Sequence, residues 1–148
     1  CTNMYSKLIL SEELRSLVES RLKDNLEGIE RTLEHIFGHQ KMGLEDLKET
    51  IQSLELSFNL FSQKWNLQIL YILFLRKTIG FGELKKTLGV NSRTLSDKLK
   101  SLKQYRYIKR TVEEEPPLRV MYSLTTRGRN TILLALPLLY YSSRDLQI

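Results

Sequence analysis

The sequence predicts a mostly helical protein that carries one small β-hairpin and begins with a long helical extension. Two apolar seams with coiled-coil spacing precede residue 62, and four shorter helical patterns and two alternating runs follow it. Charge divides at nearly the same place: residues 1–60 hold 7 Lys and Arg against 11 Asp and Glu, and residues 61–148 hold 16 against 6. We therefore predict a helical domain at 1–61 and a basic domain at 62–148.

The extension is predicted to form two helices joined by a glycine-bracketed turn at residues 38–43. Ser11 before Glu12 and Glu13 is typical of a helix start, because a hydroxyl caps free amides and acids suit the helix dipole. The seams could pack on each other, across a dimer axis or over the second domain; we favour a partner helix. Apolar residues recur at three- and four-residue spacing, at Leu22, Leu26, Ile29, Leu33 and Ile36, then at Leu44, Leu47, Ile51, Leu54, Phe58 and Phe61.

Three helices are predicted to open the second domain. Residues 64–76 are apolar on nearly all sides, which indicates a buried helix that contains Trp65 and Tyr71 as core residues. Residues 81–89 read as a short helix ended by glycine. Asn91 is a good N-cap for a helix at 92–104, whose inner face is formed by Leu95, Leu99 and Leu102.

Two strands and a last helix are predicted to complete the domain. Residues 107–112 and 119–124 alternate like strands, and the loop between them contains Glu113 to Pro117. Thr125 is expected to cap a helix from 126 to about 141, and Pro137 to kink or divide it. The order of helix, short helix, tight turn, helix, two-stranded wing and helix is that of a winged helix-turn-helix, with residues 92–104 as its recognition helix.

At these residues the chain resembles the HxlR-type branch of the MarR-like winged-helix regulators. The resemblance implies a dimeric transcriptional regulator, with the recognition helix in the major groove and the wing near the DNA backbone. It extends over residues 64–128 and is carried by Lys64-Trp65-x-x-x-Ile69-Leu70, Phe81-Gly82-Glu83-Leu84, Leu95-Ser96-x-Lys98-Leu99-x-x-Leu102, Glu115-Pro116-Pro117-x-Arg119-Val120-x-Tyr122-Ser123-Leu124-Thr125 and Gly128.

The chain departs from the family in three respects. Members usually turn into the wing through a glycine, whereas this chain has Arg106; a left-handed arginine is costly, so we expect the helix to end differently. The chain has one cysteine, Cys1, so the cysteine-based oxidant sensing of some members is not carried over. The extension at 11–61 is also longer than the usual lead-in.

The candidate base-reading residues are those that face outward if the three leucines face inward, namely Ser92, Arg93, Ser96, Asp97 and Lys100. Arg93 is the best base reader, because its planar fork matches N7 and O6 of guanine. The two serines suit either a base or a phosphate. Asp97 could accept a hydrogen bond from cytosine N4 or pair with Arg93 one turn earlier, and we favour the intrahelical pair.

Other basic residues are candidates for phosphate contacts, with a solvated surface charge as the alternative for each. We expect Arg119 to be the wing contact and Glu113, Glu114 and Glu115 to lie away from the duplex. At the start of the last helix, Arg127 could help to hold a phosphate, whereas Thr125 is read as an N-cap alone. The remaining phosphate candidates are Lys98, Lys103, Lys109 and Arg110.

A homodimer is predicted from apolar surface that one protomer cannot hide, because the last helix is apolar around its whole circumference. The candidate dimerisation residues come from the two seams and from that helix. They are Leu22, Leu26, Ile29, Leu33, Leu47, Ile51, Leu54, Phe58, Leu136 and Leu139.

These observations predict a sequence-specific regulator that binds double-stranded DNA. The alternatives are a winged helix used for protein contacts and an architectural protein that binds DNA without sequence preference.

We find no catalytic constellation or cofactor motif, and His35 and His39 lack a third metal ligand, so we expect neither enzyme activity nor a metal. The apolar run at 132–141 is too short to span a bilayer and no signal peptide is evident, so we expect a cytoplasmic protein. No effector is specified.

Overall fold

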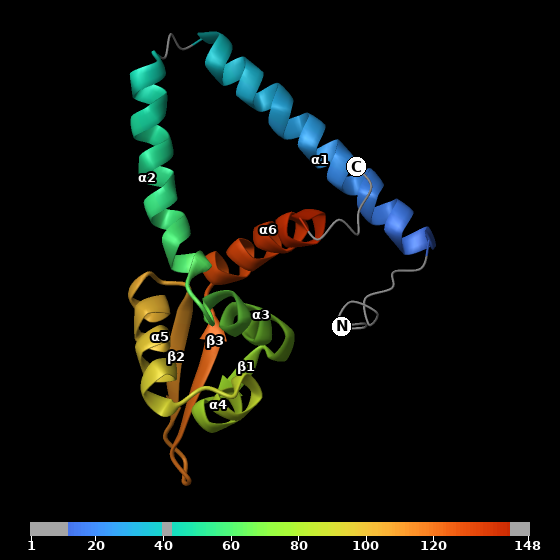
Figure 1. Cartoon of the computed structure of the whole chain (residues 1–148). Coiled ribbons are helices and arrows are strands. Elements are labelled where there is room, and N and C mark those ends of the chain that lie inside the picture. The colour runs from blue at the N-terminus through green and yellow to red at the C-terminus, as the bar shows by residue number, and fades with distance from the viewer. Residues whose placement is uncertain (1–11, 40–42, 143–148) are drawn as a thin grey trace, which may run out of the picture. The chain divides into compact units, whose positions relative to one another are not determined.

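The computed structural model describes residues 12–39 and 43–142, and the chain divides into two compact units (Figure 1). Unit 1 contains the described parts of residues 1–47 and 137–148, and unit 2 contains residues 48–136. The predicted cap at Ser11 and the centre of the turn at 38–43 lie outside the described residues.

The two helices of the predicted extension are confirmed as α1 (Glu12–His39) and α2 (Leu44–Ser62). At the start of α2, the backbone amide of Gly43 donates to Asp46 Oδ2 at 3.2 Å, so an acidic side chain of the first turn satisfies a free amide. The apolar seams of both helices are largely exposed, with Leu26 at 51% and Leu54 at 64%. The described chain thus leaves these seams uncovered.

Unit 2 confirms the predicted winged helix-turn-helix and adds one short strand. Its elements run α3 (Asn66–Arg76), β1 (Thr78–Gly80), α4 (Phe81–Leu88), α5 (Ser92–Gln104), β2 (Ile108–Glu113), β3 (Arg119–Leu124) and α6 (Thr126–Ser142), which continues beyond the unit. The sheet is antiparallel in the order β1-β3-β2, with β3 at its centre. β1 was not predicted, since three residues offer too little alternation to recognise.

The turn between α4 and α5 follows the predicted chemistry. Gly89 ends α4 in the left-handed conformation (φ 66°), a position that favours glycine. Asn91 Oδ1 then accepts a hydrogen bond from the backbone amide of Thr94 at 2.8 Å and caps α5. These two residues fix both ends of the turn, so α5 begins at Ser92, as the sequence predicts.

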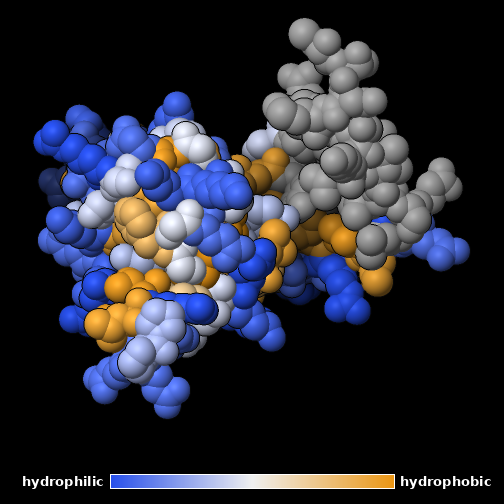
Figure 2. All heavy atoms as spheres, turned by 90° about the horizontal axis from the view of Figure 1, so that it is seen from below, coloured by the Kyte–Doolittle hydropathy of each residue, from blue (hydrophilic) through white to orange (hydrophobic). Residues whose placement is uncertain are grey.

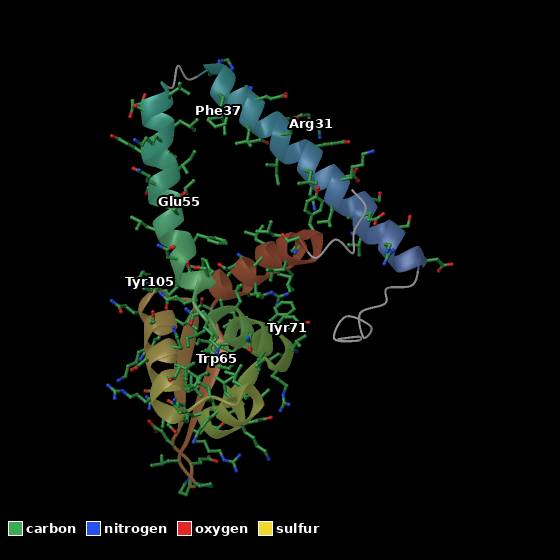
Figure 3. The ribbon with its side chains drawn as sticks, in the orientation of Figure 1. Arg31, Phe37, Glu55, Trp65, Tyr71 and Tyr105 are labelled. Atoms are coloured by element: carbon green, nitrogen blue, oxygen red, sulfur yellow. The ribbon has the colours of Figure 1, made fainter. Side chains whose placement is uncertain are left out.

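The hydrophobic core of unit 2 lies between the helices and the inner face of the sheet. Trp65 and Tyr71 are half-buried against it, as expected (Figure 3). From the end of α2, Leu60 is buried and Phe61 packs on the core, although both fall in the helical domain that the sequence predicts. The side chains at its centre are Ile69, Leu70, Leu73, Ile79, Leu84, Leu95, Leu102, Ile108 and Ile132.

Two helix boundaries correct the expectations. α3 begins at Asn66 rather than at residue 64, because Trp65 adopts a left-handed conformation (φ 79°) between α2 and α3. Asn66 is fully buried there, and its Nδ2 donates to the carbonyl of Leu60 at 2.6 Å. Pro137 does not divide the last helix, since α6 runs through it to Ser142.

The end of α5 is a further correction. Arg106 is left-handed (φ 63°), a conformation that favours glycine, so α5 ends through a left-handed residue despite the arginine. The amide of Arg106 donates to Lys103 O at 3.0 Å and that of Tyr107 donates to Leu102 O at 3.0 Å. These two hydrogen bonds form a Schellman motif, which satisfies carbonyls at the helix end and offsets part of the cost of the left-handed arginine.

Candidate nucleic-acid interface

The outward face of α5 carries three of the predicted base-reading residues. Successive residues of an α-helix are about 100° apart, so Asp97, two residues from both Leu95 and Leu99, lies opposite the buried leucines. Arg93 and Lys100 lie beside it, within about 60° around the helix, and all three side chains are exposed. Ser92 is also exposed, whereas Ser96 lies at the flank and is half-buried. The structure therefore brings Arg93, Asp97 and Lys100 together on one accessible surface, whereas Ser92 is exposed at the start of α5 on the side of the leucines.

The pairing of Asp97 with Arg93 that the spacing favoured is not present. Their four-residue separation would allow an ion pair, yet the described residues contain no salt bridge between them within 4.0 Å. A salt bridge does form elsewhere in unit 2, between Arg76 of α3 and Glu83 of α4 at 2.6 Å. The Asp97 carboxylate is therefore available on the outward face of α5.

Two lysines of α5 lie away from this surface. Lys98 is half-buried at the flank of the helix, and its Nζ donates to Gln63 Oε1 at 3.1 Å, in the segment between α2 and α3. Lys103 is exposed, but it follows Arg93 by ten residues and lies about 15 Å farther along the helix axis. The basic residues of α5 thus form no single cluster, although they are close in sequence.

The wing extends toward the end of unit 2 where α5 begins. Figure 1 shows the tip of the β2–β3 hairpin at the same end as the first turn of α5, and Figure 3 labels Tyr105 at the opposite end of that helix. Figure 2 views this end from below, where hydrophilic residues predominate around small hydrophobic areas. Base-reading candidates and wing therefore share one polar end of the unit.

The strand register restricts how the wing meets a partner. Glu113 pairs with Arg119 across the hairpin, so their side chains lie on the same face of the sheet. Our expectation that Arg119 faces the duplex while Glu113 points away is therefore incompatible with the register. Lys109 shares the face of Glu113. Arg110 lies on the other face of the sheet, next to its cross-strand partner Tyr122, which is buried. All four charged side chains are exposed.

Arg127, a predicted phosphate contact, is held against an aromatic ring. Its guanidinium carbon lies 5.0 Å from the centre of the Tyr107 ring, and Tyr107 packs edge-to-face on Phe61 at 5.0 Å. The arginine remains exposed, so the cation–π contact positions its guanidinium without removing it from solvent.

Thr125 does more than cap α6. Its Oγ1 accepts from the amide of Gly128 at 3.0 Å, which confirms the predicted cap. The same hydroxyl donates to the carbonyls of Arg106 at 2.7 Å and Tyr107 at 3.1 Å. At Gly128, a Cβ atom would lie 2.0 Å from the carbonyl oxygen of Tyr107. Thr125 and Gly128 therefore join the end of α5, the start of β2 and the start of α6.

Sequence reasoning missed two candidate contacts, Lys85 and Lys86. Both are exposed in the last turn of α4, just before the turn that leads to α5. The signal was available, because the first helix of a helix-turn-helix pair crosses the DNA backbone and lysines there suit phosphates.

The predicted dimerisation residues lie on α1, α2 and α6. Leu22 is half-buried, and Leu136 is half-buried against the core of unit 2. The other eight are exposed by 38% to 64%: Leu26, Ile29, Leu33, Leu47, Ile51, Leu54, Phe58 and Leu139.

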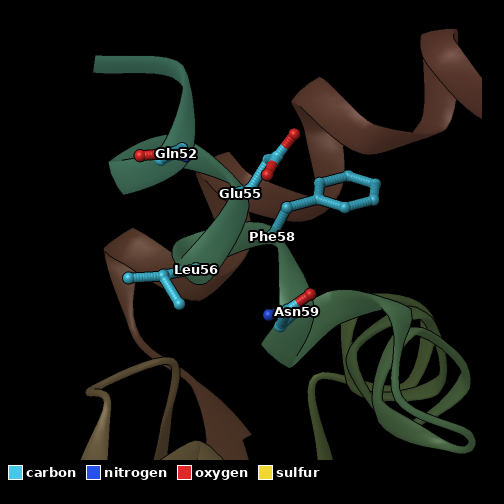
Figure 4. A pocket seen from close by; sticks show the side chains of 5 residues that line it. All are labelled: Gln52, Glu55, Leu56, Phe58 and Asn59. Carbon is cyan, nitrogen blue, oxygen red and sulfur yellow. The ribbon is translucent and has the colours of Figure 1, made fainter. Parts of the chain in front are cut away.

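Other features of the described residues are a hollow beside α2 and a pair of histidines on α1. A hollow of about 390 Å³ beside α2 is lined by Gln52, Glu55, Leu56, Phe58 and Asn59, which all come from one helix (Figure 4). The rings of His35 and His39 lie 4.8 Å apart, but no group of three or more potential metal ligands occurs among the described residues. No helix within residues 12–39 and 43–142 is long and apolar enough to cross a membrane.

Comparisons with known proteins agree with this arrangement. Over 77 residues the chain is 39% identical to the helix-turn-helix-type transcriptional regulator YdzF of Bacillus subtilis, covering 51% of this chain and 71% of the relative. Over 76 residues it is 32% identical to the regulator YodB of the same organism, covering 51% and 67%.

Solved structures show the same fold. The reduced form of YodB superposes with a TM-score of 0.56 at 25% identity, over 70% of this chain and 94% of the other. A MarR-family protein from Porphyromonas gingivalis W83 gives a TM-score of 0.56 at 30% identity, over 72% and 100%. A family model described as HxlR-like helix-turn-helix matches residues 60–143, more than half of the chain. The chain therefore belongs to the HxlR-like helix-turn-helix family, and its fold is the DNA-binding fold of these transcriptional regulators.

Proposed function

We propose that this protein is a sequence-specific transcriptional regulator that binds double-stranded DNA as a homodimer. The observation that supports this most strongly is the outward face of α5. Arg93, Asp97 and Lys100 are exposed there, opposite the buried leucines and at the end of unit 2 that carries the wing tip. A helix with polar side chains that can reach base edges is what the major groove admits.

The residues have different roles in this proposal. Arg93 reads a guanine through two hydrogen bonds, and Ser92 and Ser96 contact a base or a phosphate. Basic residues other than Arg93 and Lys100 contact phosphates, which set affinity and register rather than sequence preference. This second group comprises Lys98, Lys103, Lys109, Arg110, Arg119 and Arg127, to which Lys85 and Lys86 of α4 are added.

The homodimer is proposed from the exposed apolar seams. Ile51 is 46% exposed and Leu54 is 64% exposed on one side of α2, and α1 repeats the pattern at Leu26 and Ile29. Contiguous apolar surface of this kind is usually covered by a partner. Residues 1–61, with the end of α6, would then serve dimerisation, and two recognition helices about 34 Å apart would match half-sites one turn apart on B-DNA.

Two other functions fit the fold. A winged helix used for protein contacts has no need of a basic face on its recognition helix, and Arg93, Lys100 and the net positive charge of residues 61–148 disfavour it. An architectural protein would bind all duplexes equally. Selection of binding sites from a random duplex pool separates the three functions. A protein-contact module should bind no duplex, an architectural protein should enrich no sequence, and a sequence-specific regulator should enrich a defined sequence.

The test of the recognition helix is a pair of variants measured on the selected site. Arg93→Ala should cost about 1–3 kcal/mol on that site and relax the preference at one base pair. Lys103→Ala should weaken binding to all duplexes alike and make the salt dependence of log K shallower by about 0.9. Unchanged specific binding by Arg93→Ala would refute the placement of the helix, and a flat salt response of the wild type would refute DNA binding itself.

A further inference from the structure

Asp97 occupies the centre of the outward face of α5. It lies opposite the buried Leu95 and Leu99, its side chain is exposed, and no salt bridge joins it to Arg93. The other charged residues of this helix are Arg93, Lys98, Lys100 and Lys103, all basic. A lone carboxylate therefore stands where a DNA-binding helix comes nearest to the bases.

We propose that Asp97 determines sequence specificity by accepting a hydrogen bond from the N4 amino group of a cytosine in the major groove. This inference rests on the proposed function and deepens it. Placed among phosphates, an unpaired carboxylate loses hydration and is repelled, so it weakens binding wherever no donor meets it. A base that supplies an N–H group offsets that loss, and all other bases are disfavoured. The acid thus acts as a selector rather than as a source of affinity.

The chemistry of the base edges favours cytosine over adenine. Both bases present an exocyclic amino group in the major groove. In adenine the amino group lies next to the N7 acceptor, which repels a carboxylate, whereas in cytosine it lies next to the carbon-bound hydrogen at C5. Guanine and thymine present acceptors at the corresponding positions and offer no donor. Asp97 should therefore rank cytosine first and adenine second.

The position of this cytosine follows from the helix. Arg93 and Asp97 are four residues apart, which is about 6 Å along the axis of α5. Base pairs of B-DNA are spaced by about 3.4 Å. The cytosine should therefore lie within about two base pairs of the guanine that Arg93 reads.

The experiment is binding-site selection from a random duplex pool with the full chain, in parallel for the wild type, Asp97→Ala and Asp97→Asn. The wild type should enrich cytosine at one position, and Asp97→Ala should lose that enrichment, with discrimination reduced by about 5- to 150-fold. Asp97→Ala should also bind unselected duplexes more tightly than the wild type. Asp97→Asn should shift the preference at that position from cytosine to adenine, because an amide pairs with N6 and N7 of adenine.

Glu55→Gln provides the control for loss of an acidic charge, since Glu55 is an exposed acid of α2 and not of the recognition helix. It should leave every base preference unchanged. If the wild type has a defined site and both Asp97 variants select the same site with the same base frequencies, the inference is wrong and the proposed function stands. If the wild type selects no sequence, sequence specificity and this inference fail together. Circular dichroism of each variant verifies the fold.

Discussion

Arg106 shows how a single backbone conformation sets the geometry next to the recognition helix. Its left-handed φ of 63° lets the chain leave α5 and enter β2 two residues later. Side chains with a Cβ are strained in this region, by about 1–2 kcal/mol. The Schellman hydrogen bonds and the bond from Thr125 to the Arg106 carbonyl hold the strained conformation in place.

Arg106→Gly should therefore stabilise the protein by about 0.5–1 kcal/mol, because glycine adopts this conformation without steric cost. The gain is smaller than the strain, because glycine also increases the conformational entropy of the unfolded chain. The measurement is the urea midpoint of the free protein. Arg106→Ala is the matched control, since it removes the same side chain but keeps the Cβ strain, and it should give no such gain. Equal shifts in both variants would show that the side chain rather than the backbone is responsible.

Gly128 is the second residue at which one atom decides the packing. Gly128→Ala would bring a Cβ to 2.0 Å from the Tyr107 carbonyl oxygen, which backbone movement must relieve. We expect a loss of about 1–3 kcal/mol or more in the free energy of unfolding, measured by urea denaturation. Gly28→Ala on α1 is the control: nothing lies within 4 Å of its Cβ, and alanine favours helix, so stability should stay equal or rise. Similar losses in both variants would argue against a close approach at Gly128.

Among the elements of the winged helix-turn-helix, the wing is the one that carries a run of acidic residues, which balances its basic residues. Glu113, Glu114 and Glu115 are exposed, and the register holds Arg119 on the face that Glu113 occupies. The positive charge of Arg119 is thus partly compensated by the negative charge of Glu113, whichever face of the wing approaches a duplex. We therefore expect the wing to attract phosphates only weakly.

The double variant Glu114→Gln with Glu115→Gln should bind all duplexes more tightly, by up to about fivefold, because it removes a repulsion worth at most about 1 kcal/mol at an exposed site. Fluorescence anisotropy at low salt should show the gain, and it should shrink as salt is added. Glu49→Gln on α2 removes one acid outside the wing and should change nothing. An unchanged affinity in the wing variant would mean that the tip stays far from the phosphates.

The elements also differ in how well the sequence predicts them. α5 could be placed because its signals are local: Asn91 caps it and three leucines define its inner face. β1 could not, because Thr78 to Gly80 form a strand only through pairing with β3. The predicted ion pair between Asp97 and Arg93 was wrong, because a four-residue spacing shows only that such a contact is geometrically allowed. Arg106 was misjudged for a similar reason, since Thr125, nineteen residues away in sequence, helps to hold it.

At the scale of the whole molecule, charge and apolar surface are segregated along the chain. The acidic residues concentrate before residue 61 and the basic ones after it. The exposed apolar residues of α1 and α2 lie in the acidic part, which reduces attraction of this surface to a polyanion. This segregation is consistent with the proposal that the basic part of the chain binds DNA and the acidic part binds a second copy.

The proposed homodimer predicts a sedimentation mass of twice 17.4 kDa at micromolar concentration. Ile51→Asp with Leu54→Asp should produce monomers that bind one half-site weakly, because each carboxylate would have to be buried in the interface. Both positions are at least 46% exposed in the protomer, so its fold should persist. Ser53→Asp, on the same helix, should remain dimeric. A wild type that sediments near 17.4 kDa would refute the dimer and require the seams to close within one chain.

The hydroxyl of Thr125 has a consequence for the precision of base reading. It ties the carbonyls at the far end of α5 to the first turn of α6, so it helps to define the angle at which α5 leaves the rest of unit 2. The 13 residues of α5 form a lever of about 20 Å. A tilt of about 5° at the fixed end would displace the tip by nearly 2 Å, several times the tolerance of about 0.5 Å for a well-positioned binding group. If Arg93 and Asp97 read bases as proposed, a small displacement at Thr125 would therefore reduce their sequence discrimination.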